Sequence, residues 1–136
     1  TASGKRVIVV GYGRVGQLVC EMLARHKVPF IAVDHDPREI AGLRRQGHDV
    51  YFGDANNQAF LEQCGIRDAS SLVLTLHTEG AIDEIAQIAR ALNPDLTIIA
   101  RARDADHAKK LYRLGVTDAV PETIEASLQL SEAVLF

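Results

Sequence analysis

The chain alternates short runs that are apolar at most positions with longer stretches of helical periodicity. The apolar runs lie at residues 6–10, 29–33, 50–52, 71–76, 97–100 and 119–120. Residues with helical spacing lie at 12–26, 37–46, 56–64, 81–92, 104–114 and 122–136. A strand that is apolar at every position is buried on both faces, which is typical of a parallel sheet between two layers of helices.

This order of elements predicts an α/β fold. We expect a Rossmann-like, doubly wound parallel sheet of six strands in the order 3-2-1-4-5-6, followed by a C-terminal crossover helix. The chain has 136 residues, 47% of them hydrophobic, and no linker divides it, so we predict one domain. Residues 1–5 are expected to be a linker stub at the edge of that domain.

Composition excludes some classes of protein. No apolar run reaches the ~18 residues that a membrane-spanning helix needs. The net charge is −3 and aromatic residues make up only 5% of the chain. A protein that binds nucleic acid is therefore not expected, because it would need a basic surface or a stacking platform.

A glycine-rich motif, Gly11-Tyr12-Gly13-Arg14-Val15-Gly16, joins the first strand to the first helix. In this spacing Gly11 permits a tight turn, Gly13 leaves room for a phosphate, and Gly16 lets the helix pack closely on the strand. The helix start also offers free N–H groups to an anion. The alternative is a glycine-rich turn that binds no ligand.

Asp34 ends the second strand and favours the ligand-binding interpretation. A carboxylate at this place can accept hydrogen bonds from both hydroxyls of an adenosine ribose, and its charge would repel the 2′-phosphate of NADP. His35, the next residue, belongs to the same predicted site. Asp34 could instead cap the following helix, but Asp36, directly before Pro37, suits that role better.

Two further segments are expected to close the cofactor site. Gly53-Asp54-Ala55 follows the third strand, where Asp54 and Ala55 would flank an adenine or form a simple turn. Thr75, near the end of the fourth apolar run, and His77, just after it, could contact phosphate or ribose.

Three arginines have open roles. Arg14 lies either over the phosphates or in solvent at the helix start. Arg101 follows the fifth strand with Arg103, and the pair could form a second anion site, a subunit contact or a solvated ion-pair cluster.

No metal site or catalytic constellation is predicted. The pairs His35-Asp36, His48-Asp49 and Asp106-His107 are adjacent in sequence, and adjacent residues of a strand point to opposite faces. Cys20 and Cys64 lack the spacing of a zinc or redox motif and are expected to be ordinary buried thiols.

Several longer segments resemble one known family. They are VIVVGYGRVGQ, VDHDP, VYFGDA, IIARARDADH and AVPETIEASLQL. Together they are similar to the nucleotide-binding regulatory domain called RCK or KTN, also TrkA-N, and most of all to that of Kef-type and plastid-type potassium–proton antiporters. The resemblance runs from Arg6 to Phe136, about the whole chain.

The resemblance implies a regulatory domain that is not an enzyme. Such domains lie on the cytosolic face of the inner (plasma) membrane, as part of a multi-pass transporter, and gate potassium–proton antiport by the attached membrane domain. They bind AMP, ADP, ATP or NAD(H), and they form homodimers in which the last helix, here 122–136, crosses to the partner. Carried over by position, the nucleotide-binding residues are Gly11, Gly13, Arg14, Gly16, Asp34, Asp54 and Ala55.

Two other functions remain as alternatives. A fragment of an NAD-dependent oxidoreductase would share the glycine motif, but the strands consume the chain and leave no substrate domain or convincing proton donor. A free-standing Trk-type regulatory subunit is the other alternative. The stub-like start and the apolar end, Val134-Leu135-Phe136, favour a piece of a larger transporter. A last helix that docks on its own sheet would explain that end as well.

Overall fold

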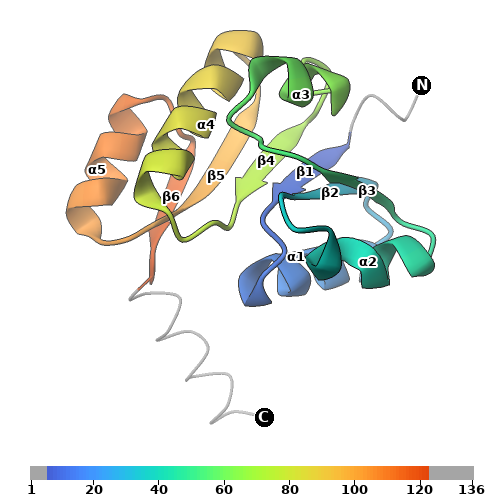
Figure 1. Cartoon of the computed structure of the whole chain (residues 1–136). Coiled ribbons are helices and arrows are strands. Elements are labelled where there is room, and N and C mark those ends of the chain that lie inside the picture. Colours follow the sequence, from blue (N-terminus) through green and yellow to red (C-terminus); the bar gives the residue numbers. More distant parts are fainter. Residues whose placement is uncertain (1–5, 123–136) are drawn as a thin grey trace, which may run out of the picture.

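A computed structural model describes residues 6–122 and confirms the predicted doubly wound α/β fold. All strands are parallel and form one six-stranded sheet in the order β3-β2-β1-β4-β5-β6 (Figure 1). The strands are β1 (Val7–Val10), β2 (Phe30–Asp34), β3 (Asp49–Phe52), β4 (Ser71–Leu74), β5 (Thr97–Ala102) and β6 (Asp118–Pro121). The helices are α1 (Arg14–Arg25), α2 (Pro37–Arg45), α3 (Gln58–Gln63), α4 (Glu79–Leu92) and α5 (Ala105–Arg113).

The helices cover both faces of the sheet. Helices α1 and α2 lie on one face, and α3, α4 and α5 on the other (Figure 1). In β1, Ile8 and Val10 belong to the core under α3 to α5, whereas Val7 and Val9 belong to the core under α1 and α2. This two-sided burial explains why β1 shows no polar alternation.

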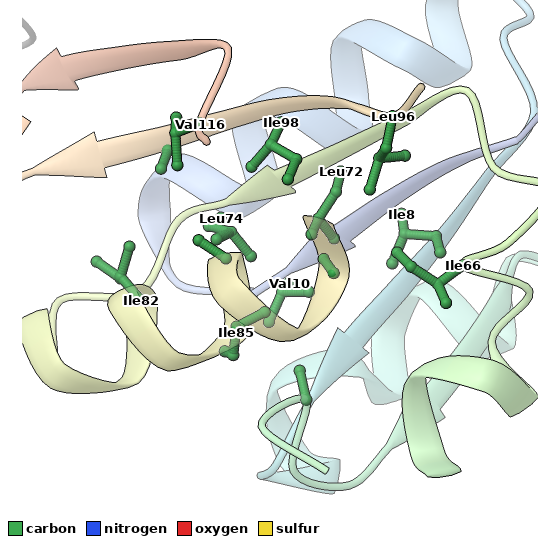
Figure 2. Close-up of a cluster of buried hydrophobic side chains, with 14 of the residues drawn as sticks. Ile8, Val10, Ile66, Leu72, Leu74, Ile82, Ile85, Leu96, Ile98 and Val116 are labelled. Atoms are coloured by element: carbon green, nitrogen blue, oxygen red, sulfur yellow. The ribbon is translucent and has the colours of Figure 1, made fainter. Parts of the chain in front are cut away.

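The larger core holds the sheet to α4. Figure 2 shows Ile82 and Ile85 of α4 beside Leu72 and Leu74 of β4, with Val10 close by. Of these five side chains, none is more than 3% exposed. Helix α4 is therefore fixed directly over the end of β4, where the loop that follows this strand begins.

Local sequence sets the start of α2 as predicted. The side chain of Asp36 accepts a hydrogen bond from the Arg38 N–H at 3.0 Å, and Pro37 occupies the first turn. Gly47, just after the helix, has a φ of +88°. A residue in this left-handed conformation commonly ends a helix.

Some boundaries differ from the expected ones. Helix α1 begins at Arg14 rather than at residue 12, because residues 11–13 form the turn. Strand β5 extends to Ala102, which pairs with Pro121 of β6. The sequence pattern ended this strand early because Arg101 interrupts the apolar run.

Two predicted segments lie outside the described residues. They are the linker stub 1–5 and the crossover helix 122–136, apart from Glu122. Among residues 6–122, no helix is both long and apolar enough to cross a membrane.

Candidate functional site

A cleft of about 500 Å³ opens at the carboxyl ends of the strands. It lies where β1 has β2 on one side and β4 on the other, so that the chain winds away in both directions. Such a point of reversal is where ligands bind in open α/β sheets. All predicted site residues except Gly16 line the cleft: Gly11, Tyr12, Gly13, Arg14, Val15, Asp34, His35, Asp54, Ala55, Thr75, His77 and Arg101.

The three motif glycines have different geometries. Gly11 has a φ of +96°, which L side chains rarely adopt. A Cβ on Gly16 would lie 2.0 Å from the Gly11 carbonyl oxygen, so this residue brings α1 close to the turn instead of lining the cleft. A Cβ on Gly13 would meet nothing within 4 Å. Each glycine thus has the spatial role that its place in the motif predicts.

The start of α1 offers an environment for an anion. Gly13 is the N-cap and gives no side-chain hydrogen bond, and the first turn contains no acidic residue. The first backbone N–H groups and the positive end of the helix dipole are therefore not neutralised from within the helix. Arg14 is exposed beside them at the lip of the cleft.

Asp34 is buried and already holds two backbone groups. Its Oδ2 accepts a hydrogen bond from the Tyr12 N–H at 2.7 Å, and its Oδ1 accepts one from the Asp36 N–H at 2.9 Å. A carboxylate offers about four acceptor positions, so a ribose hydroxyl can still donate to it. Asp34 also fastens the glycine turn to β2, a role that the sequence pattern did not reveal.

The segment after β3 is both a turn and a wall of the cleft. The Asn57 N–H donates to the Asp54 carbonyl at 3.2 Å, which closes the turn, and the Gly53 N–H donates to the Asp34 carbonyl at 3.1 Å. Ala55 is buried in the main core, and Asp54 is exposed. The turn is therefore present and lines the cleft, whereas the contact of Asp54 and Ala55 with an adenine stays a prediction.

Polar groups gather on the β4–β5 side of the cleft. Arg101 donates to the Thr75 carbonyl at 3.2 Å, and its guanidinium lies 3.8 Å from the Glu122 carboxylate. The His77 ring is 3.2 Å from Arg101 and 3.6 Å from Glu122. Arg103 does not line the cleft and pairs with Glu79 at 3.2 Å, which matches the ion-pair alternative for this residue.

One cluster of potential metal ligands forms outside the cleft, among residues 6–122. The donor atoms of Glu79, Asp83 and His107 lie within 4.8 Å of one another. The Arg103 N–H donates to Nδ1 of His107 at 2.9 Å, so the proton of the neutral ring is on Nε2, which lies 2.8 Å from Asp83. A metal would need that nitrogen free of its proton.

The cluster is better described as an ion-pair network between α4 and α5. Burial raises the pKa of Asp83, but hydrogen bonds from Lys110, at 2.8 Å, and from His107 outweigh burial and hold this pKa below its ordinary value. The carboxylates beside the His107 ring, Glu79 and Asp83, come from α4 and not from its sequence neighbour Asp106, so adjacency in the sequence did not indicate this network.

Several further residues line the cleft that the sequence pattern did not single out as site residues. They include Asp36, Glu39, Asn56, Ala81 and Ile85. Ala81 and Ile85 are four positions apart on one face of α4, a spacing that predicted a helix but gave no sign of a ligand site. Only the placement of α4 over the end of β4 shows that this face also reaches the cleft.

Comparisons with known proteins agree with this fold. The TrkA-N domain family matches residues 7–122. A similar curated protein is K(+) efflux antiporter 2, chloroplastic, of Arabidopsis thaliana, at 36% identity over 129 residues, which are 95% of this chain and 11% of that protein. The chain spans between 11% and 21% of the length of such potassium efflux antiporters.

Solved structures show the same architecture. The TrkA-N domain of inner membrane protein YbaL from Escherichia coli superposes with a TM-score of 0.87 at 30% identity, covering 95% of this chain and 96% of that one. The Kef CTD of Shewanella denitrificans in AMP-bound form has a TM-score of 0.81 at 35% identity, covering 96% and 79%. GsuK structures bound to NAD and to ADP, both at 19% identity, share the fold, with TM-scores of 0.78 and 0.77.

Proposed function

The chain belongs to the TrkA-N domain family, and from that premise we propose that it senses an adenine nucleotide and regulates potassium–proton antiport by a membrane domain of the same polypeptide. The observation that carries the proposal is the cleft, which brings the glycine turn, the start of α1 and Asp34 together at one point of the sheet. The AMP-bound Kef CTD, at 35% identity, supports AMP as the first ligand to test.

Each part of the nucleotide has a matching part of the cleft. The phosphate binds at the turn of Gly11 to Gly16, where N–H groups and the exposed Arg14 favour an anion. The ribose hydroxyls donate to Asp34, and the adenine lies against the segment of Asp54 and Ala55. NAD(H), ADP and ATP contain the same adenosine phosphate unit and remain candidate ligands.

Regulation requires that the nucleotide binds two states of the domain with different affinity. We propose a homodimer built from α4 and the C-terminal helix, residues 122–136, whose arrangement changes with ligand. The position of the domain at the cytosolic face of the inner (plasma) membrane is part of the same proposal, and the similar TrkA-N domain of an inner membrane protein supports it.

The central test is calorimetric titration of dialysed protein with AMP. Asp34→Ala should weaken binding by about 1–3 kcal/mol, because hydrogen bonds to a charged acceptor are lost. Asp106→Ala is the matched control, because it removes an exposed carboxylate of α5 that does not line the cleft. Equal affinity of the Asp34 variant and the wild type would remove Asp34 from the site. A wild-type protein that binds neither AMP nor NAD at millimolar concentration would refute the sensor.

Two further measurements address the remaining parts of the proposal. The chain should sediment as a dimer, and truncation after Glu122 should yield monomers, whereas a monomeric full chain would refute the interface. Incubation with NADH and candidate acceptors should give no hydride transfer. Turnover would instead support the oxidoreductase alternative.

A further inference from the structure

We propose that Thr75 is a positioning residue, whose buried hydroxyl holds the Gly11–Tyr12 peptide in the orientation that binds phosphate. The inference rests on the proposed function, because it concerns the same cleft. It differs from the expectation that Thr75 itself contacts phosphate or ribose.

The Thr75 hydroxyl is committed to the protein backbone. Its Oγ1 lies 2.9 Å from the Gly11 carbonyl oxygen and 3.0 Å from the Val10 carbonyl oxygen, and Thr75 is 6% exposed. A hydroxyl has a single hydrogen to donate, and a phosphate oxygen without a proton can only accept one. Thr75 therefore cannot donate to a phosphate while that hydrogen is directed at either carbonyl.

The Gly11–Tyr12 peptide is fastened at both of its polar groups. Its carbonyl oxygen accepts from Thr75, just after β4, and its N–H donates to Asp34, at the end of β2, at 2.7 Å. A peptide unit is planar, so fixing its carbonyl and its N–H fixes the whole plane. Because β2 and β4 are the two neighbours of β1, the turn is tied to the sheet from both sides.

This peptide needs to be fastened because glycine leaves it free to rotate. Gly11 has a φ of +96°, a conformation outside the preferred range of other residues. The position of its carbonyl oxygen also sets the position of α1, since a Cβ on Gly16 would lie 2.0 Å from that oxygen. The Thr75 hydroxyl thereby fixes the turn and the helix start that together bind the phosphate.

Two substitutions separate the hydroxyl from the rest of the side chain. Thr75→Val keeps the shape without the hydroxyl, and the Thr75 N–H still donates to the Val10 carbonyl at 2.9 Å, so the strand end keeps its backbone bond. Thr75→Ser keeps the hydroxyl without the methyl group. Thr75→Val should weaken AMP binding about five- to tenfold. The affinity for adenosine, which has no phosphate, should change by less than about twofold. Thr75→Ser should bind AMP within about twofold of the wild type.

A second measurement needs no ligand. In Thr75→Val the Tyr12 amide should exchange its hydrogen about tenfold faster than in the wild type, while amides of β2 stay protected. A direct contact between Thr75 and the ligand would leave this rate unchanged. If wild-type protein binds no nucleotide, the proposed function fails, and the exchange rate still tests the tether.

Three results would overturn the inference. They are an unchanged Tyr12 exchange rate in Thr75→Val, unchanged AMP affinity in that variant, and an equal loss of AMP and adenosine binding. The last result would show that the hydroxyl supports the fold in general and not the phosphate turn.

Discussion

Alanine substitution at two glycines of the motif should affect different properties of the protein. Gly16→Ala should lower stability, whereas Gly13→Ala should weaken nucleotide binding. In Gly16→Ala the new Cβ would lie 2.0 Å from the Gly11 carbonyl oxygen and 3.1 Å from the Thr75 Oγ1. Separations below 3.0 Å essentially never occur for real Cβ atoms, so α1 and the turn must move apart by about 1 Å. In Gly13→Ala the Cβ would meet nothing within 4 Å.

The expected magnitudes follow from these contacts. Overpacking of this kind typically costs about 1–3 kcal/mol, and the helix propensity of alanine offsets at most about 1 kcal/mol. We expect Gly16→Ala to lose about 2 kcal/mol of unfolding free energy, which for a chain of this length lowers Tm by about 7 °C. Gly13→Ala should keep its Tm within about 3 °C, because the φ of Gly13, −76°, suits alanine.

Gly13→Ala should instead weaken the binding of AMP. Its methyl group would enter the space that the phosphate needs, so AMP affinity should fall by about tenfold or more at nearly unchanged stability. Thermal unfolding by circular dichroism and calorimetric titration with AMP measure the two effects. A Gly16→Ala protein that melts at the wild-type temperature would refute the close-packing argument. A Gly13→Ala protein that binds AMP normally would refute the phosphate site.

Three further predictions concern the core and its titrating groups. The buried Asn93 donates to two backbone carbonyls at 2.9 and 3.3 Å, so Asn93→Leu should lower the urea unfolding free energy by about 2–4 kcal/mol. The pKa of Asp83 is lowered in the folded state despite its burial, so the ionised carboxylate stabilises the fold at neutral pH. This stabilisation should be lost as pH falls below about 4. In urea titrations at successive pH values, Asp83→Asn should make that loss of unfolding free energy smaller. Burial raises the pKa of Cys20 to about 12 and that of Cys64 to about 11. Iodoacetamide at pH 8 should therefore alkylate neither thiol until urea unfolds the chain. Alkylation of the native protein would contradict this prediction.

The strand pattern predicted where much of the cleft lies. Strands that are apolar throughout predict a parallel sheet, and parallel strands place all their carboxyl ends at one edge. Residues that follow different strands, such as Gly11, Asp34 and Asp54, were therefore expected at one edge, and they line one cleft. The cap at Asp36 was predictable for a simpler reason, because its bond to the Arg38 N–H spans only two positions.

The pattern could not reveal second roles for the same residues. Asp34 was expected to hold a ribose, and it also accepts from Tyr12, 22 positions earlier in the chain. Thr75 was expected to contact a ligand, yet its hydroxyl faces the Gly11 carbonyl, 64 positions away. No periodicity encodes such pairs, because they depend on how closely two strands and a turn approach.

The sequence by itself determined the fold class, the strand order, the position of the glycine turn and the edge of the sheet where the cleft opens. These depend on local terms: side-chain period, caps and backbone freedom at glycine. Only the tertiary structure decided which carbonyl the Thr75 hydroxyl faces, which carboxylates surround His107 and which face of α4 reaches the cleft. Hydrogen bonds form over about 3 Å, so their partners are set by packing distances that a linear pattern does not contain.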